Sequence, residues 1–192
     1  MTGREDMIIY PGDILFIRNP NLFGRLIAWF TTKKGEEKTW ATHIGVFVSN
    51  GFLMTKGAAG AKLVEAVNRV KYHNFLDRYT TDNQFAIARP RKLTNEQQYT
   101  ITNRAIGYVG MTYGYLKIGL HAIDQLLGDI YFFRRLGRLD RYPICSYLVA
   151  KCYAAAGLNF GVPPGKATPD DIWDFCMRNP DKYRFLYYSH VM

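Results

Sequence analysis

The order of apolar and polar residues along the chain predicts short strands through its first half. Five apolar or alternating segments bounded by turn residues are 14–17, 42–48, 52–55, 62–67 and 84–89. Asn50-Gly51 is the strongest two-residue hairpin signal in the chain and would join the second segment to the third. Because strands adjacent in sequence usually pair, we expect an antiparallel meander over 42–67.

Apolar residues at three- and four-residue steps predict helices elsewhere. These helices are expected at 22–30, 94–109, 116–127, 145–156 and from 168 onward, with a last strand at 183–188. Thr94 begins a sequence typical of a capping box, and Thr168 is followed by proline and two acids, which also indicates a helix start. Residues 68–83 are expected to be irregular or to form a short helix.

Composition limits the class of protein. A chain of 192 residues with 48% apolar and 15% aromatic residues suits one domain, covering 1–192, with a full core. Twenty-five Lys and Arg against 16 Asp and Glu give a net charge of +9. This charge favours an anionic partner, either nucleic acid, acidic lipid or an anionic cell-wall polymer, without choosing among them.

Three cysteines cannot form a complete disulfide framework, which favours a reducing compartment. Residues 1–6 are polar and no apolar signal core follows them, nor does any run approach the length of a membrane span. We therefore expect synthesis as a soluble cytoplasmic protein, with release by lysis or virion packaging left open.

Cys145 is the first candidate for chemistry. Pro143 disfavours helix just before it, and the helical periodicity begins at the cysteine and ends at Gly157. A thiol in the first turn of a helix lies at the positive end of the dipole, where the attacking thiolate is favoured. A buried structural cysteine is the alternative interpretation of the same position.

A cysteine nucleophile needs a base and a group that orients the base. Of the four histidines, only His43 lies in a predicted strand with apolar neighbours, where its ring needs a hydrogen-bond partner. Glu65 is flanked by apolar residues in another predicted strand and has the same need. We expect these two to pair, either as a base with its orienting group beside Cys145 or as a buried pair without catalysis.

Neither a cofactor nor a metal is expected to be required. The other histidines lack zinc-ligand spacing, and the three cysteines form no CxxC pair. Cys152 lies two turns after Cys145 on the same helix face and is expected to belong to the core.

The order of these motifs resembles a known family, the circularly permuted NlpC/P60 proteins, and within it the YiiX/YebB-like branch of the papain-like superfamily. The matching stretches are Pro11-Gly12-Asp13-Ile14-Leu15, 42–48, Glu65, 110–115, 144–149 and 168–171. The resemblance implies an α+β, papain-like fold in which an antiparallel sheet or half-barrel packs against the helix of the nucleophile.

The resemblance also implies a cysteine hydrolase (amidase or peptidase) acting on amide bonds of cell-wall peptides or related small peptides. By motif match Cys145 would be the nucleophile, His43 the base and Glu65 the orienting residue. The backbone N–H of Cys145 would be one oxyanion donor.

Two other functions remain open from the sequence. An aromatic and basic segment at 22–34 and an aromatic segment at 131–133 would suit a lipid-directed acyl hydrolase or acyltransferase with peripheral membrane contact. Four arginines between 134 and 141 would suit a non-catalytic basic module that binds nucleic acid or an anionic polymer. A solvated charged face explains these arginines better, so nucleic acid is the less favoured partner.

Overall fold

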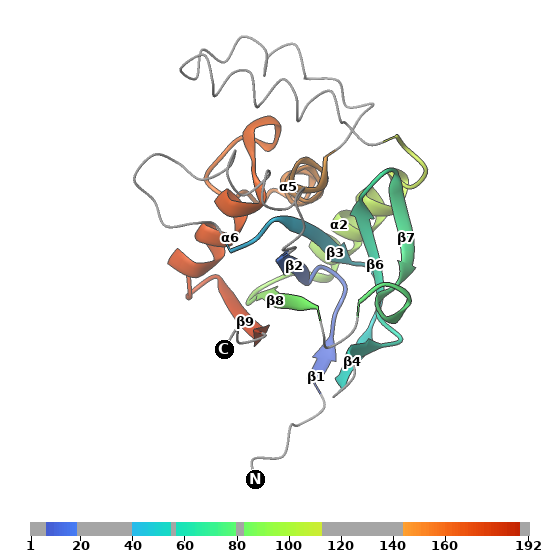
Figure 1. The fold of residues 1–192 in the computed structure, drawn as a ribbon. Helices are drawn as coiled ribbons and strands as arrows, with labels where there is room; N and C mark the ends of the chain where they lie inside the picture. Colours follow the sequence, from blue (N-terminus) through green and yellow to red (C-terminus); the bar gives the residue numbers. More distant parts are fainter. Residues whose placement is uncertain (1–6, 19–39, 55–56, 80–82, 113–143, 189–192) are drawn as a thin grey trace.

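A six-stranded antiparallel sheet forms the centre of the molecule (Figure 1). The computed structural model describes residues 7–18, 40–54, 57–79, 83–112 and 144–188. The strand order is β7-β6-β3-β2-β8-β9. Its strands are β2 (Ile14–Arg18), β3 (His43–Phe47), β6 (Lys62–Ala66), β7 (Val70–Asn74), β8 (Gln84–Pro90) and β9 (Tyr183–Tyr188).

A second sheet of three short strands replaces the predicted meander. It contains β1 (Met7–Ile9), β4 (Gly51–Met54) and β5 (Gly57–Ala59), in the order β1-β4-β5. The prediction that 42–48 and 52–55 pair as a hairpin is therefore wrong. Strand β3 has β2 on one side and β6 on the other, so no edge of β3 is left for β4, and the chain leaves the main sheet at this turn.

Residues 68–83 contain more regular structure than predicted. They include strand β7 and the 3-10 helix η1 (Phe75–Asp77). Strand β7 lies at the edge of the main sheet and buries only Val70 fully, so its sequence lacks the apolar alternation that predicts a strand.

Three described α-helices accompany the sheets: α2 (Asn95–Gly107), α5 (Cys145–Ala155) and α6 (Pro169–Arg178). Thr94 and Thr168 cap α2 and α6 with complete capping boxes, as predicted. A second 3-10 helix, η2 (Pro164–Lys166), precedes α6. Antiparallel sheets with separate helices confirm the α+β class.

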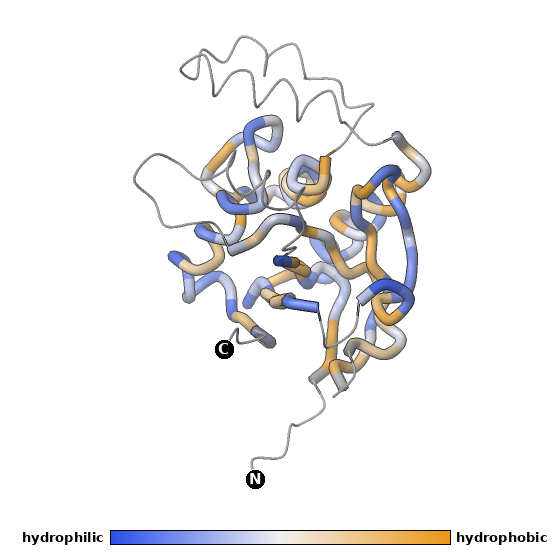
Figure 2. The backbone as a smooth tube through the Cα atoms, in the orientation of Figure 1, coloured by the Kyte–Doolittle hydropathy of each residue, from blue (hydrophilic) through white to orange (hydrophobic). Residues whose placement is uncertain are grey.

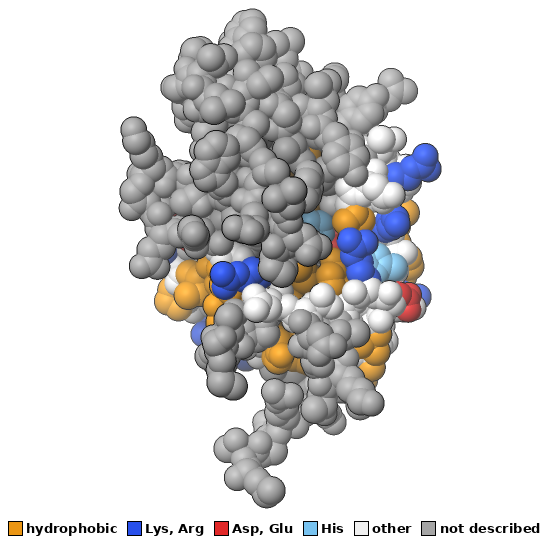
Figure 3. Space-filling model, viewed as in Figure 1, with side chains coloured by type: hydrophobic (Ala, Val, Ile, Leu, Met, Phe, Trp, Pro, Cys, Tyr) orange, Lys and Arg blue, Asp and Glu red, His pale blue; other side chains and the backbone are white. Residues whose placement is uncertain are grey.

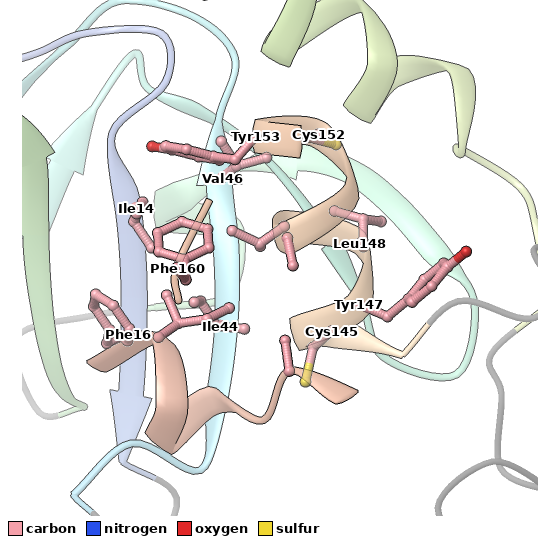
Figure 4. Close-up of a cluster of buried hydrophobic side chains, with 14 of the residues drawn as sticks. Ile14, Phe16, Ile44, Val46, Cys145, Tyr147, Leu148, Cys152, Tyr153 and Phe160 are labelled. Atoms are coloured by element: carbon pink, nitrogen blue, oxygen red, sulfur yellow. The ribbon is translucent and has the colours of Figure 1, made fainter. Parts of the chain in front are cut away.

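The alternation of side chains divides the core between the two faces of the main sheet. On one face, Ile44 and Val46 pack with residues of α5 such as Leu148 and Tyr153 (Figure 4). On the other face, a second cluster lies between the main sheet, the small sheet and η1. It contains Leu15, Phe47, Leu63, Phe75 and Phe85. Figure 2 shows hydrophobic stretches along the central strands and α5, and a hydrophilic β7.

Several predictions concern segments outside the described residues. These are the helices at 22–30 and 116–127, the aromatic and basic segment at 22–34, which would suit either the core or a membrane surface, and the aromatic and arginine-rich connector at 128–141. Among the residues that are described, no helix combines the length and apolar character needed to cross a membrane.

Candidate active site

The site is built around Glu65, a carboxylate whose side chain is 0% exposed to solvent. Glu65 lies in β6 directly opposite Gly45 of β3. A Cβ atom on Gly45 would lie 3.2 Å from the Cβ of Glu65, so the glycine leaves room for the carboxylate over β3. His43 is two residues before Gly45 and therefore faces the same side of the sheet. The pairing of β3 with β6 thus brings His43 to Glu65.

Four groups bind the carboxylate of Glu65, two at each oxygen. Oε2 accepts from His43 Nε2 at 2.5 Å and from the Tyr79 hydroxyl at 2.7 Å. Oε1 lies 2.9 Å from His73 Nε2 and 3.3 Å from Nε of Arg78. A buried carboxylate is stable only when its charge is compensated and its lone pairs are used, and these contacts do both.

The Cys145 side chain lies beside His43 at the N-terminus of α5. Helix α5 packs on the opposite face of the sheet from Glu65, but its first residue lies beside the Ile44 end of β3 (Figure 4). His43 is the first residue of β3, and the Cys145 side chain is among the groups that raise the pKa of its ring, which places the thiol beside the imidazole. Since Nε2 of His43 is used by Glu65, Nδ1 is the nitrogen left for the thiol. The imidazole therefore joins the carboxylate to the cysteine.

Electrostatic interactions among Glu65, His43 and their neighbours favour the ionised forms of both side chains. Burial alone would lower the pKa of His43, but the charge of Glu65, followed by the interaction with Cys145, raises it to about 10. Burial alone would raise the pKa of Glu65, but the charge and hydrogen bond of His43, with hydrogen bonds from His73 and Tyr79, hold it well below its ordinary value. At neutral pH the carboxylate is ionised and His43 is an imidazolium.

The start of α5 also has backbone N–H groups that no hydrogen bond within the helix uses. The first hydrogen bond within the helix runs from the Leu148 N–H to the Ile144 carbonyl. N–H groups earlier in a helix have no partner inside it, and Ile144 supplies no side-chain cap. The Cys145 side chain lies here with the residue 4% exposed.

The sequence interpretation missed three residues of this group, namely His73, Tyr79 and Arg78. All three come from 68–83, the stretch predicted to be irregular or a short helix. No local pattern indicates them, because their relation to Glu65 depends on β7 pairing with β6 and on the turn after η1. The structure places two described histidines, not one, on the same carboxylate.

The other two cysteines are buried in the core. Cys152 is a residue of α5 that faces the core, where burial raises the pKa of its thiol to about 12. Burial also raises the pKa of the Cys176 thiol in α6. The prediction that Cys152 belongs to the core is confirmed.

Comparison with known proteins supports the fold. No family model and no curated protein sequence matches the chain. Among solved structures, the chain is similar to the crystal structure of the metalloprotein yiiX from Escherichia coli O157:H7, DUF1105, with a TM-score of 0.58 at 17% sequence identity. The match covers 93% of this chain and 97% of that chain. The two proteins share a fold, which agrees with the YiiX-like resemblance of the sequence motifs.

The word metalloprotein describes that structure and does not transfer to the site in this chain. Within the described ranges, no group of three His, Cys, Asp or Glu side chains is arranged to hold a metal ion. His43 and His73 both direct Nε2 at Glu65, so these two nitrogens bind the carboxylate and do not converge on a common point. The residues seen here do not fit a metal centre.

Proposed function

We propose that this protein is a papain-like cysteine hydrolase of the permuted NlpC/P60 type that cleaves amide bonds. Cys145 is the nucleophile, His43 the proton carrier and Glu65 the residue that orients His43. One observation carries the proposal: the His43 ring lies between a buried carboxylate and a cysteine in the first turn of helix α5. Nucleophile, base and orienting group in that order are the arrangement that cysteine catalysis requires.

In the first half of the reaction, Cys145 acts as a thiolate beside the His43 imidazolium, a pairing that favours the reactive form. The sulfur attacks the carbonyl carbon, and the backbone N–H groups at the start of α5 face the oxygen on which negative charge develops. The C–N bond breaks, and the imidazolium gives its proton to the leaving amine. A thioester and a neutral His43 remain.

In the second half, neutral His43 takes a proton from water, which attacks the thioester carbonyl. Collapse of this intermediate breaks the C–S bond and releases the carboxylic acid, and the thiolate and imidazolium pair is restored. Glu65 holds the ring in place through both steps without losing its own charge.

The proposed substrate class is the one that the motif resemblance implies. A hydrolase of this type would act on cell-wall peptides or related small peptides, and the net charge of +9 suits an anionic cell-wall polymer as the carrier of those peptides. Figure 3 shows Lys and Arg side chains beside His side chains on the face it draws, as an anionic substrate would need.

Alkylation of the three cysteines tests the nucleophile. Iodoacetamide is added at pH 7, and mass spectrometry follows each cysteine over time. We expect Cys145 to react at least tenfold faster than Cys152 or Cys176. Because Cys145 is also slightly more exposed, His43→Ala is the critical variant, and it should remove most of the difference. The control Cys152→Ala should leave the rate at Cys145 unchanged.

Equal labelling of all three cysteines, or a fast Cys145 that does not depend on His43, would contradict the proposed mechanism. The substrate class is tested separately by amine release from purified cell-wall stem peptides, compared with fatty acid release from phospholipid. Release of fatty acid alone would favour the lipid-directed alternative. Either activity should disappear in Cys145→Ala.

A further inference from the structure

His73 has hydrogen-bond acceptors at both of its ring nitrogens. Nε2 lies 2.9 Å from Glu65 Oε1, and Nδ1 lies 3.0 Å from the backbone carbonyl oxygen of Asn74. A carbonyl oxygen cannot donate, and Glu65 is an ionised carboxylate. A neutral imidazole carries one N–H, whereas an imidazolium carries two. Both contacts are hydrogen bonds only if His73 is the doubly protonated cation.

The surroundings of His73 agree with a cation at this position. Among the described residues, the charged or titratable groups that face it are Glu65 from β6, Arg78 and Tyr79 from the turn after η1, and exposed Lys71 two positions earlier on β7. Glu65 is in direct contact. The hydrogen bond to Glu65 raises the pKa of His73, against the opposing effects of partial burial and of the Arg78 charge.

From this geometry we infer that His73 is a positioning residue that holds Glu65 Oε1 as an imidazolium and thereby limits how tightly Glu65 retains the proton of His43. This inference rests on the proposed function. It adds a role for a histidine that lies on the other side of Glu65 from Cys145.

Two physical effects of His73 act in the same direction on His43. The positive charge of His73 repels a positive charge on His43, because both rings touch one carboxylate. The hydrogen bond of His73 also withdraws negative charge from Glu65, which weakens the attraction of Oε2 for the His43 proton. Both effects make His43 release its proton more easily.

Easier release of that proton matters for the complete reaction. His43 gives its proton to the leaving amine in the first half of the reaction and takes a proton from water in the second. A His43 that interacted with Glu65 alone would hold its proton tightly and would oppose the transfer to the amine, although it would still accept a proton from water. The charge on His73 moves His43 towards a proton affinity that serves both steps.

Histidine titration by NMR tests this inference without any substrate. The full-length protein is labelled with ¹⁵N in its imidazole rings, and the resonances of His43 and His73 are assigned with His43→Gln and His73→Gln. We expect both nitrogens of His73 to be protonated at pH 7. In His73→Gln, which keeps a donor but removes the charge, the titration midpoint of His43 should rise by about one pH unit.

Matched variants separate charge from packing. His73→Lys restores a positive charge and should bring the His43 midpoint back towards that of the wild type. Arg178→Gln removes a charge from an exposed pair on α6 and should leave the midpoint unchanged. A neutral His73 at pH 7, or a His43 midpoint that is the same in His73→Gln and wild type, would overturn the inference.

Failure of this inference can be told apart from failure of the proposed function. If alkylation shows no dependence of Cys145 on His43, the proposed hydrolase is wrong whatever the NMR titration shows. If alkylation of Cys145 depends on His43 but the titration midpoint of His43 does not change with the charge at position 73, the proposed hydrolase is supported and the role of His73 is refuted. With an active substrate, the alkaline limb of the rate profile should move upward in His73→Gln along with the midpoint.

Discussion

Replacing Glu65 by Gln is the most direct test of how the site is held together. The substitution keeps the size of the side chain but removes its charge and one of its two acceptor oxygens. The remaining carbonyl oxygen can accept from one pair of donors. The new NH2 group then faces the other pair, which is either His43 with Tyr79 or His73 with Arg78.

The expected loss of stability is large because the contacts are buried and charged. Removing one partner of a buried ion pair costs about 3–5 kcal/mol. A second route gives a similar figure: raising the pKa of His43 from 6.5 to about 10 corresponds to about 5 kcal/mol at 1.36 kcal/mol per pH unit. These figures describe one interaction from two sides and are not added. We expect Glu65→Gln to lower the free energy of unfolding by about 3–5 kcal/mol at pH 6.

The pH dependence of stability gives a sharper signature than the loss itself. The folded pKa of Glu65 is depressed, so its contribution is present above the ordinary value of 4.5 and is lost as pH falls below it. The folded pKa of His43 is raised, so its contribution is complete below 6.5 and is lost as pH rises towards about 10. Wild-type stability should therefore peak between about pH 4.5 and 6.5 and decline above it.

Urea unfolding followed by tryptophan fluorescence at pH 5.5, 7.5 and 9.5 measures this dependence. The decline from pH 5.5 to 9.5 should be several kcal/mol in the wild type and should largely disappear in Glu65→Gln. Glu96→Gln, a change at an exposed carboxylate on α2, should alter stability by about 0.5 kcal/mol or less. A Glu65→Gln protein with the same alkaline decline as the wild type would refute the coupling of Glu65 to His43.

Two further predictions concern the scaffold, and urea unfolding at pH 7 measures both. A Cβ atom on Gly51 would lie 2.5 Å from the backbone nitrogen of Ala61, so Gly51→Ala should destabilise the protein by about 2 kcal/mol. Gly107→Ala, at the end of α2, should instead stabilise it by about 0.5–1 kcal/mol. An equal effect of the two substitutions would contradict the close approach of Gly51 to Ala61. Arg89 binds buried Asp13 through Nε at 2.8 Å and a second nitrogen at 2.5 Å, so Arg89→Ala should cost about 3–5 kcal/mol, and a loss below about 1 kcal/mol would show that Asp13 finds another partner.

Local features of the sequence were sufficient to place the nucleophile candidate and its helix. Pro143 before Cys145, the apolar periodicity after it, and Gly157 at its end all act within a few residues of one another. Helix α5 accordingly runs from Cys145 to Ala155, and Gly157 follows with a positive φ of 76°. The capping box at Thr94 and the helix start at Thr168 are equally local and were predicted for the same reason.

The contact of His43 with Glu65 was also predictable, but by a different route. Each is a polar residue in an apolar strand and needs a buried partner, and the structure joins them at 2.5 Å. The neighbours proposed for their strands were nevertheless wrong, because β3 pairs directly with β6 and not through β4. The sequence indicated that His43 and Glu65 each need a polar partner, but it did not indicate the order of the strands.

The sequence by itself indicated most of the described strands and helices, where the cysteine helix begins, and that His43 and Glu65 each require a partner. These properties depend on residues within a turn or two of each other, so local periodicity and capping reveal them. Only the tertiary structure decided that β4 leaves for a second sheet and that His73, Tyr79 and Arg78 bind Glu65. Those contacts depend on which strands lie side by side, and strand order is fixed by the packing of the whole chain.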